Sequence, residues 1–101
     1  EYIYGNYIYL TNYLKKRLPA VRIFPLEATY LVWLDFNGLN ISADELKRII
    51  FDCAGVGLND GRTFGELEGR GFQRMNIACP RVILKKAIRR IVCAFKSNNI
   101  I

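Results

Sequence analysis

The chain has 101 residues, with 15 Lys and Arg against 9 Asp and Glu, no histidine, and 51% hydrophobic positions. This length and composition predict one soluble domain with enough apolar side chains to build a core. The absence of histidine excludes every Ser-His-Asp, Cys-His or His-ligand metal mechanism within this chain, because imidazole is the proton carrier or ligand in all of them.

Helical spacing of apolar residues predicts a helix over residues 1–18, which Pro19 ends after three basic residues. The apolar stripe consists of Ile3, Tyr7, Leu10, Leu14 and Leu18. A second stripe beside it consists of Tyr2, Tyr9 and Tyr13. Together the two stripes form an apolar arc wider than one small sheet would cover, so we expect a further partner there.

Two β-rich runs follow, residues 21–24 and 30–36, separated by Pro25 and a short polar stretch. The second run, YLVWLDF, is almost continuously hydrophobic, which predicts a central strand buried on both faces. Asp35, Asn37 and Gly38 are residues typical of a turn, so the strand should end there.

A helix is predicted over residues 42–55, because Ser42 and Glu45 form a capping box and Gly55 suits a left-handed helix end. A short strand is expected at residues 56–58, followed by a loop with four glycines between positions 61 and 71. The strand at 72–78 would place Arg74 on one face with Phe72 and Asn76. Pro80 then opens a last amphipathic helix that runs to about Lys96.

The predicted order is helix, strand, strand, helix, strand, strand, helix, without the alternation that builds a parallel doubly wound sheet. The fold class is therefore α+β, with helices packed on a small, mostly antiparallel sheet. The cysteines Cys53, Cys79 and Cys93 form no CxxC pair, and we expect them to be small buried residues in a reducing cytoplasm. Neither a membrane span nor a signal peptide is predicted.

Basic charge is concentrated at the end of the chain. Residues 69–101 hold eight basic and no acidic side chains, whereas residues 1–68 hold seven basic and nine acidic ones. Nucleic-acid contact is one interpretation. A solvated helix face is the one we favour, since the cations lie opposite the apolar stripe and no stacking aromatics lie between them.

Arg74 is the candidate site residue. A guanidinium halfway along a strand, just past a glycine-rich loop, can donate two parallel hydrogen bonds to a planar carboxylate. The alternative is a structural arginine at a sheet edge, paired with Asp35 or Asp52. The loop itself lacks a P-loop lysine and a directly following helix, so it either shapes a site shared with another domain or is a plain solvent loop.

Three stretches together resemble a known family: PLEATYLVWLDF, SADELKRIIFDCAG and VGLNDGRTFGELEGRGFQRMNIACPR. They are similar to the C-terminal small domain of fold-type-I pyridoxal-phosphate (PLP) enzymes of the class I/II aminotransferase group. Within that group the resemblance is greatest to the bacterial cystathionine β-lyase-like carbon–sulfur lyases. The chain also opens at Glu1 and has its only methionine at position 75, so we expect a fragment of a longer polypeptide.

The resemblance implies that residues 1–101 are the small domain and that residues 1–18 are a remnant of the helix linking it to a missing large domain. It implies that Arg74 grips the α-carboxylate of an amino-acid substrate. The lysine that binds the cofactor and the other cofactor-binding groups would belong to the large domain. Pyridoxal 5'-phosphate is therefore expected in a longer, cytoplasmic, homodimeric parent, whereas this chain alone would be inactive and hold no cofactor or metal.

Whether the parent is an aminotransferase or a lyase that breaks a C–S bond stays open, as does its substrate. A rival interpretation is a free-standing binding module with a basic C-terminal helix, and a third is a structural interaction domain with an exposed tyrosine stripe. Under the leading interpretation we expect neither a nucleic-acid nor a membrane partner.

Overall fold

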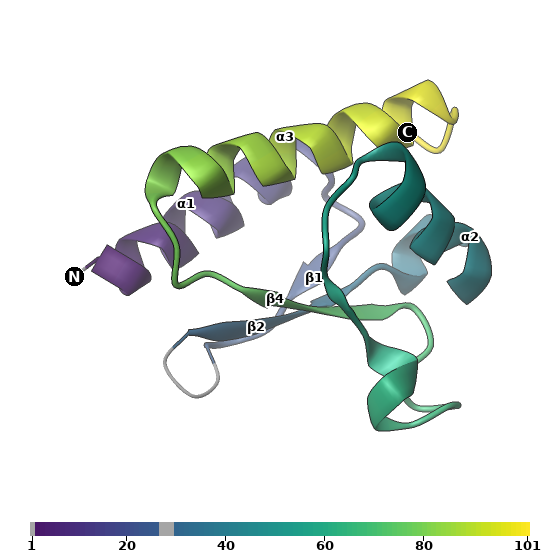
Figure 1. Cartoon of the computed structure of the whole chain (residues 1–101). Coiled ribbons are helices and arrows are strands. Elements are labelled where there is room, and N and C mark those ends of the chain that lie inside the picture. The colour runs from purple at the N-terminus through teal and green to yellow at the C-terminus, as the bar shows by residue number, and fades with distance from the viewer. Residues whose placement is uncertain (1, 27–29) are drawn as a thin grey trace.

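The computed structural model describes residues 2–26 and 30–101 (Figure 1). Residues 27–29, the EAT of the motif EATYLVWLD, lie outside the described residues. The elements in chain order are α1 (Tyr2–Arg17), β1 (Arg22–Ile23), β2 (Leu31–Asp35), η1 (Asn37–Leu39), α2 (Ala43–Lys47), η2 (Arg48–Cys53), β3 (Asn59–Asp60), η3 (Gly61–Phe64), β4 (Phe72–Asn76) and α3 (Arg81–Ser97). This order confirms the predicted succession of helices and strands.

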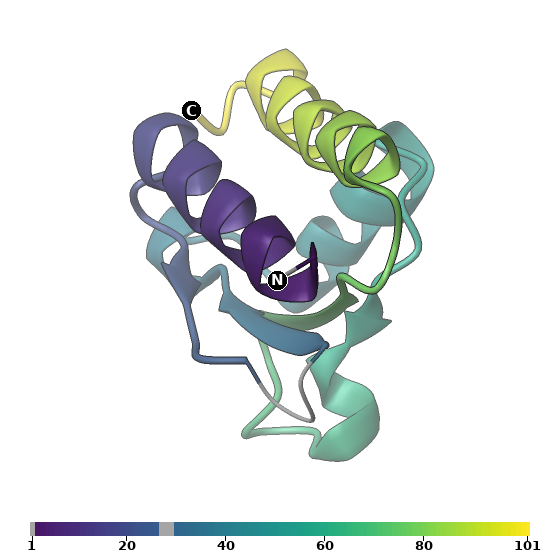
Figure 2. The same cartoon turned by 90° about the vertical axis from the view of Figure 1, so that its left-hand side faces the viewer.

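The four strands form one antiparallel sheet in the order β1-β2-β4-β3. The helices α1, α2 and α3 all lie on the same side of this sheet (Figures 1 and 2). The α+β class with helices on a small antiparallel sheet is thus confirmed. On the other side of the sheet the described residues include no α-helix, and only the short 3-10 helix η3 lies there (Figures 1 and 2).

The strand β2 lies between β1 and β4, so its predicted central position is confirmed. Its predicted burial on both faces is wrong. Val32 and Leu34 are 0% and 1% exposed beneath the helices, whereas Leu31 and Trp33, on the other face, are only half-buried. Because the helices cover one side only, the sheet presents an apolar, partly exposed surface on the other, which we call the open face.

The helix after Ser42 begins as predicted, since the Ser42 hydroxyl accepts a hydrogen bond from the Glu45 amide at 3.0 Å. The second half of the predicted capping box is absent. The Glu45 carboxylate instead accepts hydrogen bonds from Arg48 at 2.9 and 2.7 Å, which holds its pKa below the ordinary value through that hydrogen bond. From Arg48 onward the helix widens to a π-helix.

The strand predicted at residues 56–58 is wrong, since the strand β3 comprises Asn59–Asp60. The Val56 amide donates a hydrogen bond to the Ile50 carbonyl at 3.0 Å, so it bonds to the end of the π-helix and not to a neighbouring strand. Gly55 has the predicted positive φ, at 69°. Leu58 is buried in the core.

The expected stripe of α3 is confirmed, because Leu84, Ile88, Ile91, Val92 and Phe95 are all buried. Leu10, Leu14 and Leu18 of the first segment join the same core.

The expectation that the cysteines are buried is wrong for two of them. Cys53 and Cys93 are exposed, and only Cys79 is half-buried, where loss of solvation raises the pKa of its thiol. No helix within residues 2–26 and 30–101 has the length and apolarity to cross a membrane.

Candidate functional site

Arg74 lies at the middle of β4, an internal strand, and not at a sheet edge as the structural alternative supposed. Its Cα partners are Trp33 on β2 and Asn59 on β3. Its neighbours along the strand, Gln73 and Met75, are buried beneath the helices. Alternation along a strand therefore directs Arg74 to the open face, together with Phe72.

The Arg74 guanidinium lies beside an aromatic ring on this face. Its Cζ atom lies 5.9 Å from the centroid of the Trp33 ring, within the range of a cation–π contact. The Trp33 ring meets Phe72 edge-on, with centroids 6.3 Å apart. Asp35, a possible partner of Arg74 by sequence, instead accepts hydrogen bonds from Arg22 at 2.9 and 3.1 Å and from Asn37 at 2.9 Å. Asp52 lies exposed on η2.

A hollow of about 270 Å³ opens beside this aromatic group. It is lined by Phe24, Trp33, Gly61, Glu68, Gly69 and Phe72. The rings come from three separate parts of the sheet, and the glycines come from the loop between β3 and β4. The walls are therefore apolar, with one carboxylate at the loop. Sequence reasoning missed this hollow, because its lining meets only through the strand order.

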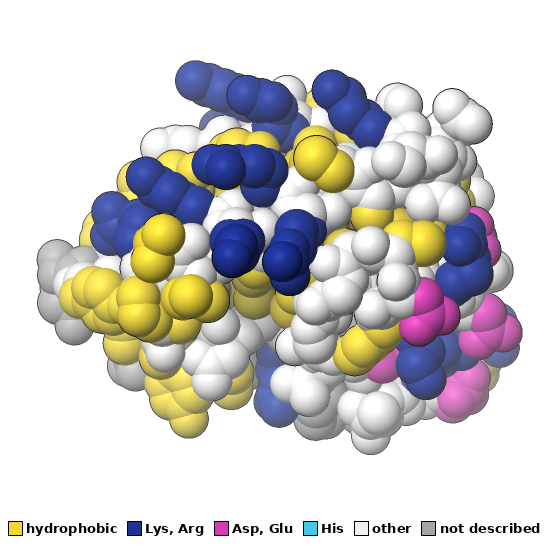
Figure 3. All heavy atoms as spheres, turned by 45° about the horizontal axis from the view of Figure 1, so that its top comes forward, with side chains coloured by type: hydrophobic (Ala, Val, Ile, Leu, Met, Phe, Trp, Pro, Cys, Tyr) yellow, Lys and Arg dark blue, Asp and Glu magenta, His cyan; other side chains and the backbone are white. Residues whose placement is uncertain are grey.

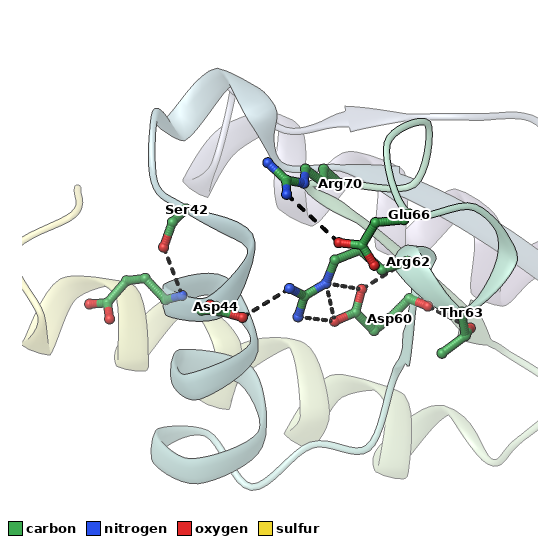
Figure 4. A network of polar contacts seen from close by, with 8 residues as sticks. Ser42, Asp44, Asp60, Arg62, Thr63, Glu66 and Arg70 are labelled. Carbon is green, nitrogen blue, oxygen red and sulfur yellow. Dashed lines mark hydrogen bonds and ion pairs between the residues drawn. The ribbon is translucent and has the colours of Figure 1, made fainter.

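The glycine-rich loop is tied to α2 by Arg62 (Figure 4). Arg62 donates to Asp60 at 2.8 Å and to Asp44 at 2.9 Å, and its backbone amide donates to the Asp60 carboxylate at 2.9 Å. Burial opposes ionisation of Asp60, yet the hydrogen bonds from Arg62 leave its pKa below the ordinary value. An ion pair thus fixes the start of the loop relative to the helix.

The loop also packs closely on itself and on the turn after β2. A Cβ added to Gly69 would lie 2.0 Å from the Gly61 carbonyl oxygen. Gly71 has a φ of 80°, and a Cβ there would lie 2.1 Å from the Asn37 Oδ1 atom. These positions accept only glycine without rearrangement. The loop therefore has a defined shape, and its Gly61 and Gly69 line the hollow.

A buried asparagine that the sequence analysis did not single out connects α1 to the end of the Arg74 strand. Asn6 is 0% exposed, and its Nδ2 donates to the carbonyls of Ile77 and Cys79 at 2.9 and 2.8 Å. Its Oδ1 accepts from the Arg81 Nε at 2.7 Å. The sequence could have indicated Asn6 in one way, since it is a polar residue beside the apolar stripe, between Ile3 and Leu10. Asn6 holds α1, the segment after β4, and the start of α3 together.

The cations of α3 lie exposed, as the solvated-face interpretation predicted, and no acidic residue occurs in α1 or α3 (Figure 3). The expectation that no aromatic ring lies among these cations is wrong, because the Lys85 Nζ lies 5.2 Å from the ring of Tyr9 on α1. The packing of α1 beside α3 brings this pair together. A second contact, between the Arg17 Cζ and the Tyr13 ring at 5.2 Å, lies within α1.

The chain offers no candidate for a cofactor-binding lysine. All six lysines belong to the described residues, and all are exposed on helices. Such positions lack the desolvated pocket that activates a catalytic lysine. The described residues also contain no group of three or more Cys, Asp or Glu side chains placed to hold a metal. The residues present do not fit PLP as a resident group of this chain.

No family model matches the sequence. Individual proteins do match it. The chain is 33% identical over 96 residues to protein MalY of Escherichia coli, which covers 95% of this chain and 24% of MalY. It is 34% identical over 93 residues to the cystathionine β-lyase PatB of Bacillus subtilis, covering 92% of this chain and 24% of that protein. The chain therefore spans about a quarter of the length of these curated relatives.

Solved structures agree with the sequence relatives. Cystalysin from Treponema denticola, which contains PLP, superposes with a TM-score of 0.89 at 26% identity over 96% of this chain and 24% of its own. The PLP-bound C–S lyase of Staphylococcus hominis superposes with a TM-score of 0.81 at 31% identity, over 96% of this chain and 26% of its own. Both matches span nearly all of the α+β unit described above.

The chain is similar over nearly its whole length to cystathionine β-lyases, to MalY and to PLP-bound carbon–sulfur lyases, and it matches their small C-terminal domain. The resemblance predicted from the sequence is confirmed.

Proposed function

We propose that this chain is the small domain, residues 1–101, of a PLP-dependent enzyme that acts on amino acids by transamination or by β-elimination of a C–S bond. Residues 1–18 would continue the helix that links it to a large domain. The parent would be a cytoplasmic homodimer. The large domain would supply the cofactor and the catalytic lysine, because this chain has no lysine in a suitable environment.

The observation that carries the proposal is the position of Arg74 on the open face. Arg74 lies on an internal strand, paired with Trp33 on one side and Asn59 on the other, and its half-buried side chain lies against the Trp33 ring. In such surroundings a charge-assisted, bidentate bond to a carboxylate is stronger than in bulk water. Arg74 would grip the α-carboxylate of the substrate, and this grip would orient the bond at Cα that is to be broken.

The apolar open face supports the second part of the role, closure over the reacting centre. Leu31, Trp33 and Phe72 are half-buried on the open face, the side of the sheet opposite α1, α2 and α3. A large domain packed against them would exclude water from the substrate and strengthen the interaction of Arg74 with its carboxylate. The fixed glycine loop would border the same cleft.

Steady-state kinetics of the longer enzyme test the carboxylate clamp. Replacing Arg74 by Ala removes two charge-assisted hydrogen bonds, so KM for amino acids should rise by about 10²- to 10⁴-fold while PLP stays bound. Arg74→Lys keeps the positive charge but cannot donate two parallel hydrogen bonds, so its KM should lie between those of the unaltered enzyme and of Arg74→Ala. Arg89→Ala, an exposed cation on α3, is the control. An unchanged KM in Arg74→Ala would refute the clamp.

The rival function, a binding module for acidic partners, is favoured by one observation. The surface of α1 and α3 is lined by Lys and Arg without any acid (Figure 3). A salt titration of nucleic-acid binding separates the two functions. Affinity that falls steeply with salt would support the module, whereas the enzyme interpretation predicts no binding at physiological salt.

A further inference from the structure

We propose that a surface pocket between η2 and the end of α3 is a site of covalent modification, in which the Cys53 thiol exchanges with a small peptide disulfide that carries carboxylates. The pocket belongs to the helical layer, on the side of the sheet opposite the open face that bears Arg74 (Figure 1). The inference is therefore independent of the proposed carboxylate clamp.

Two thiols from separate elements line this pocket, which we call the thiol pocket. Cys53 is the last residue of η2 and Cys93 lies on α3, and both are exposed and free. The lining also includes the cation Arg90 and the polar residues Ser97 and Asn98, and among these described lining residues none is acidic. The pocket measures about 550 Å³. Pockets for drug-sized ligands measure about 300 to 1,000 Å³, so a small peptide fits this space.

The π-helix places a guanidinium against the Cys53 sulfur. Backbone hydrogen bonds in η2 join residues five apart, as from the Ala54 amide to the Ile49 carbonyl at 2.8 Å. This widening brings residues i and i+5 near each other, and the Arg48 Nη1 donates to the Cys53 Sγ at 3.4 Å. Single π-turns are rare and occur frequently at functional sites. The unusual helix end thus builds the contact on which the proposal depends.

Arg48 also connects this sulfur to the opposite wall of the thiol pocket. Its Nη2 donates to the Asn98 Oδ1 at 2.9 Å, and the Asn98 Nδ2 donates to the Ala94 carbonyl at 2.7 Å. The Glu45 carboxylate accepts from the same guanidinium at 2.9 and 2.7 Å. The guanidinium therefore has a fixed place between the Cys53 sulfur and the end of α3.

The step is a thiol–disulfide exchange. The Cys53 thiolate attacks one sulfur of the peptide disulfide, whose S–S bond breaks, and a mixed disulfide forms on Cys53. The other half leaves as a thiolate, which takes up the proton that Cys53 lost. The protein sulfur is oxidised and the departing sulfur is reduced, so the step needs no further oxidant. Arg48 stabilises negative charge on the attacking sulfur, and Arg90 attracts the carboxylates of the incoming peptide.

Cys79 provides an internal comparison. It is half-buried outside the thiol pocket, and loss of solvation raises the pKa of its thiol. Less of its thiolate is present at neutral pH, so Cys79 should exchange slowly. Cys93 is exposed in the same pocket as Cys53, and we expect it to react after Cys53, to whose sulfur Arg48 donates.

Peptide mapping of the native protein after treatment with oxidised glutathione tests the site. Trypsin cuts after Lys and Arg, so the three cysteines fall on separate peptides, residues 49–62, 75–81 and 91–96. The mixed disulfide should form about tenfold faster in peptide 49–62 than in peptide 75–81. The diethyl ester of oxidised glutathione has no free carboxylate and should modify Cys53 about three- to tenfold more slowly.

Two variants make the test specific. Arg90→Gln should reduce the preference for the free acid over the ester, whereas Arg89→Gln, an exposed cation of α3 that does not line the pocket, should not. Arg48→Gln removes the donor to the Cys53 sulfur, so both reagents should modify Cys53 more slowly while Cys93 keeps its rate. Arg90 is exposed, so its substitution keeps the test valid if Arg48→Gln fails to fold.

A second reagent tests whether the two thiols share one pocket. Once the adduct on Cys53 occupies the thiol pocket, alkylation of Cys93 by iodoacetamide should slow severalfold. Alkylation of Cys79, which lies outside the pocket, should not change. An unchanged rate at Cys93 would contradict a shared pocket.

Three results would overturn the proposal. The first is equal modification of Cys53 by the free acid and by the ester. The second is faster exchange at Cys93 or Cys79 than at Cys53. The third is a Cys53 thiol that reacts only after the native protein is unfolded, because another part of the polypeptide would then cover the pocket.

Discussion

The Arg81 Nε donates a hydrogen bond of 2.7 Å to the Oδ1 of Asn6, a side chain with no exposed surface. The same Asn6 donates to the carbonyls of Ile77 and Cys79, just past the strand that bears Arg74. One amide thus joins the first helix, the Arg74 strand and the last helix. In the proposed enzyme, movement of the linking helix would be passed directly to the clamp.

Replacing Asn6 by Ala should lower the free energy of unfolding by about 2 to 4 kcal/mol, because the Ile77 carbonyl and the Arg81 Nε lose their partner. Denaturant titration of the chain measures the change. Asn12→Ala, an exposed asparagine on the same helix, is the control and should have little effect. Equal effects of the two substitutions would contradict the structural role given to Asn6.

Gly71→Ala should destabilise the chain by about 1 to 3 kcal/mol, since its φ of 80° disfavours a side chain and its Cβ would meet Asn37. The Asn37 side chain cannot move freely, because it bonds to Asp35 and to the Arg70 carbonyl. Gly57→Ala is the matched control, with no atom within 4 Å of its Cβ. Thermal unfolding should show a lower midpoint for the first substitution only.

Stability should fall in acid through Asp60. Its pKa is lowered in the folded state, so its contribution is present above the unfolded value of about 3.9 and is lost as pH falls through the folded value. Asp60→Asn should cost about 1 kcal/mol at pH 7 and should make unfolding less sensitive to pH below about 4. Asp52→Asn, exposed on η2, should keep the acid sensitivity of the parent chain. An unchanged acid profile in Asp60→Asn would argue against the Arg62 ion pair.

Local signals were sufficient for most elements of the fold. The apolar stripe behind Pro80 predicted α3, and Ser42 predicted the start of α2, because helix caps and periodicity depend on nearby residues. The position of β3 and the π-helix could not be predicted in this way. Both depend on how the segment after Arg48 fits over the sheet, and that fit is set by tertiary packing.

The candidate site was predictable only in part. The position of Arg74 on a strand after the glycine-rich loop made it the candidate but left Asp35 and Asp52 as possible partners, and its expected role came only from the family resemblance. The hydrophobic run of β2 suggested burial on both faces, but the structure covers only the Val32 and Leu34 side. Neither the hollow nor the Lys85–Tyr9 contact has a signature along the chain, because each joins segments that meet only after folding.

The most direct test of the account is the identity of the polypeptide that carries this chain. Peptide mapping of the native protein after borohydride reduction should find sequence preceding Glu1, including a peptide in which a lysine carries reduced PLP. The length should be about four times that of this chain, as in its relatives. A native polypeptide that begins at or near Glu1 and holds no PLP would contradict the account and favour the binding module.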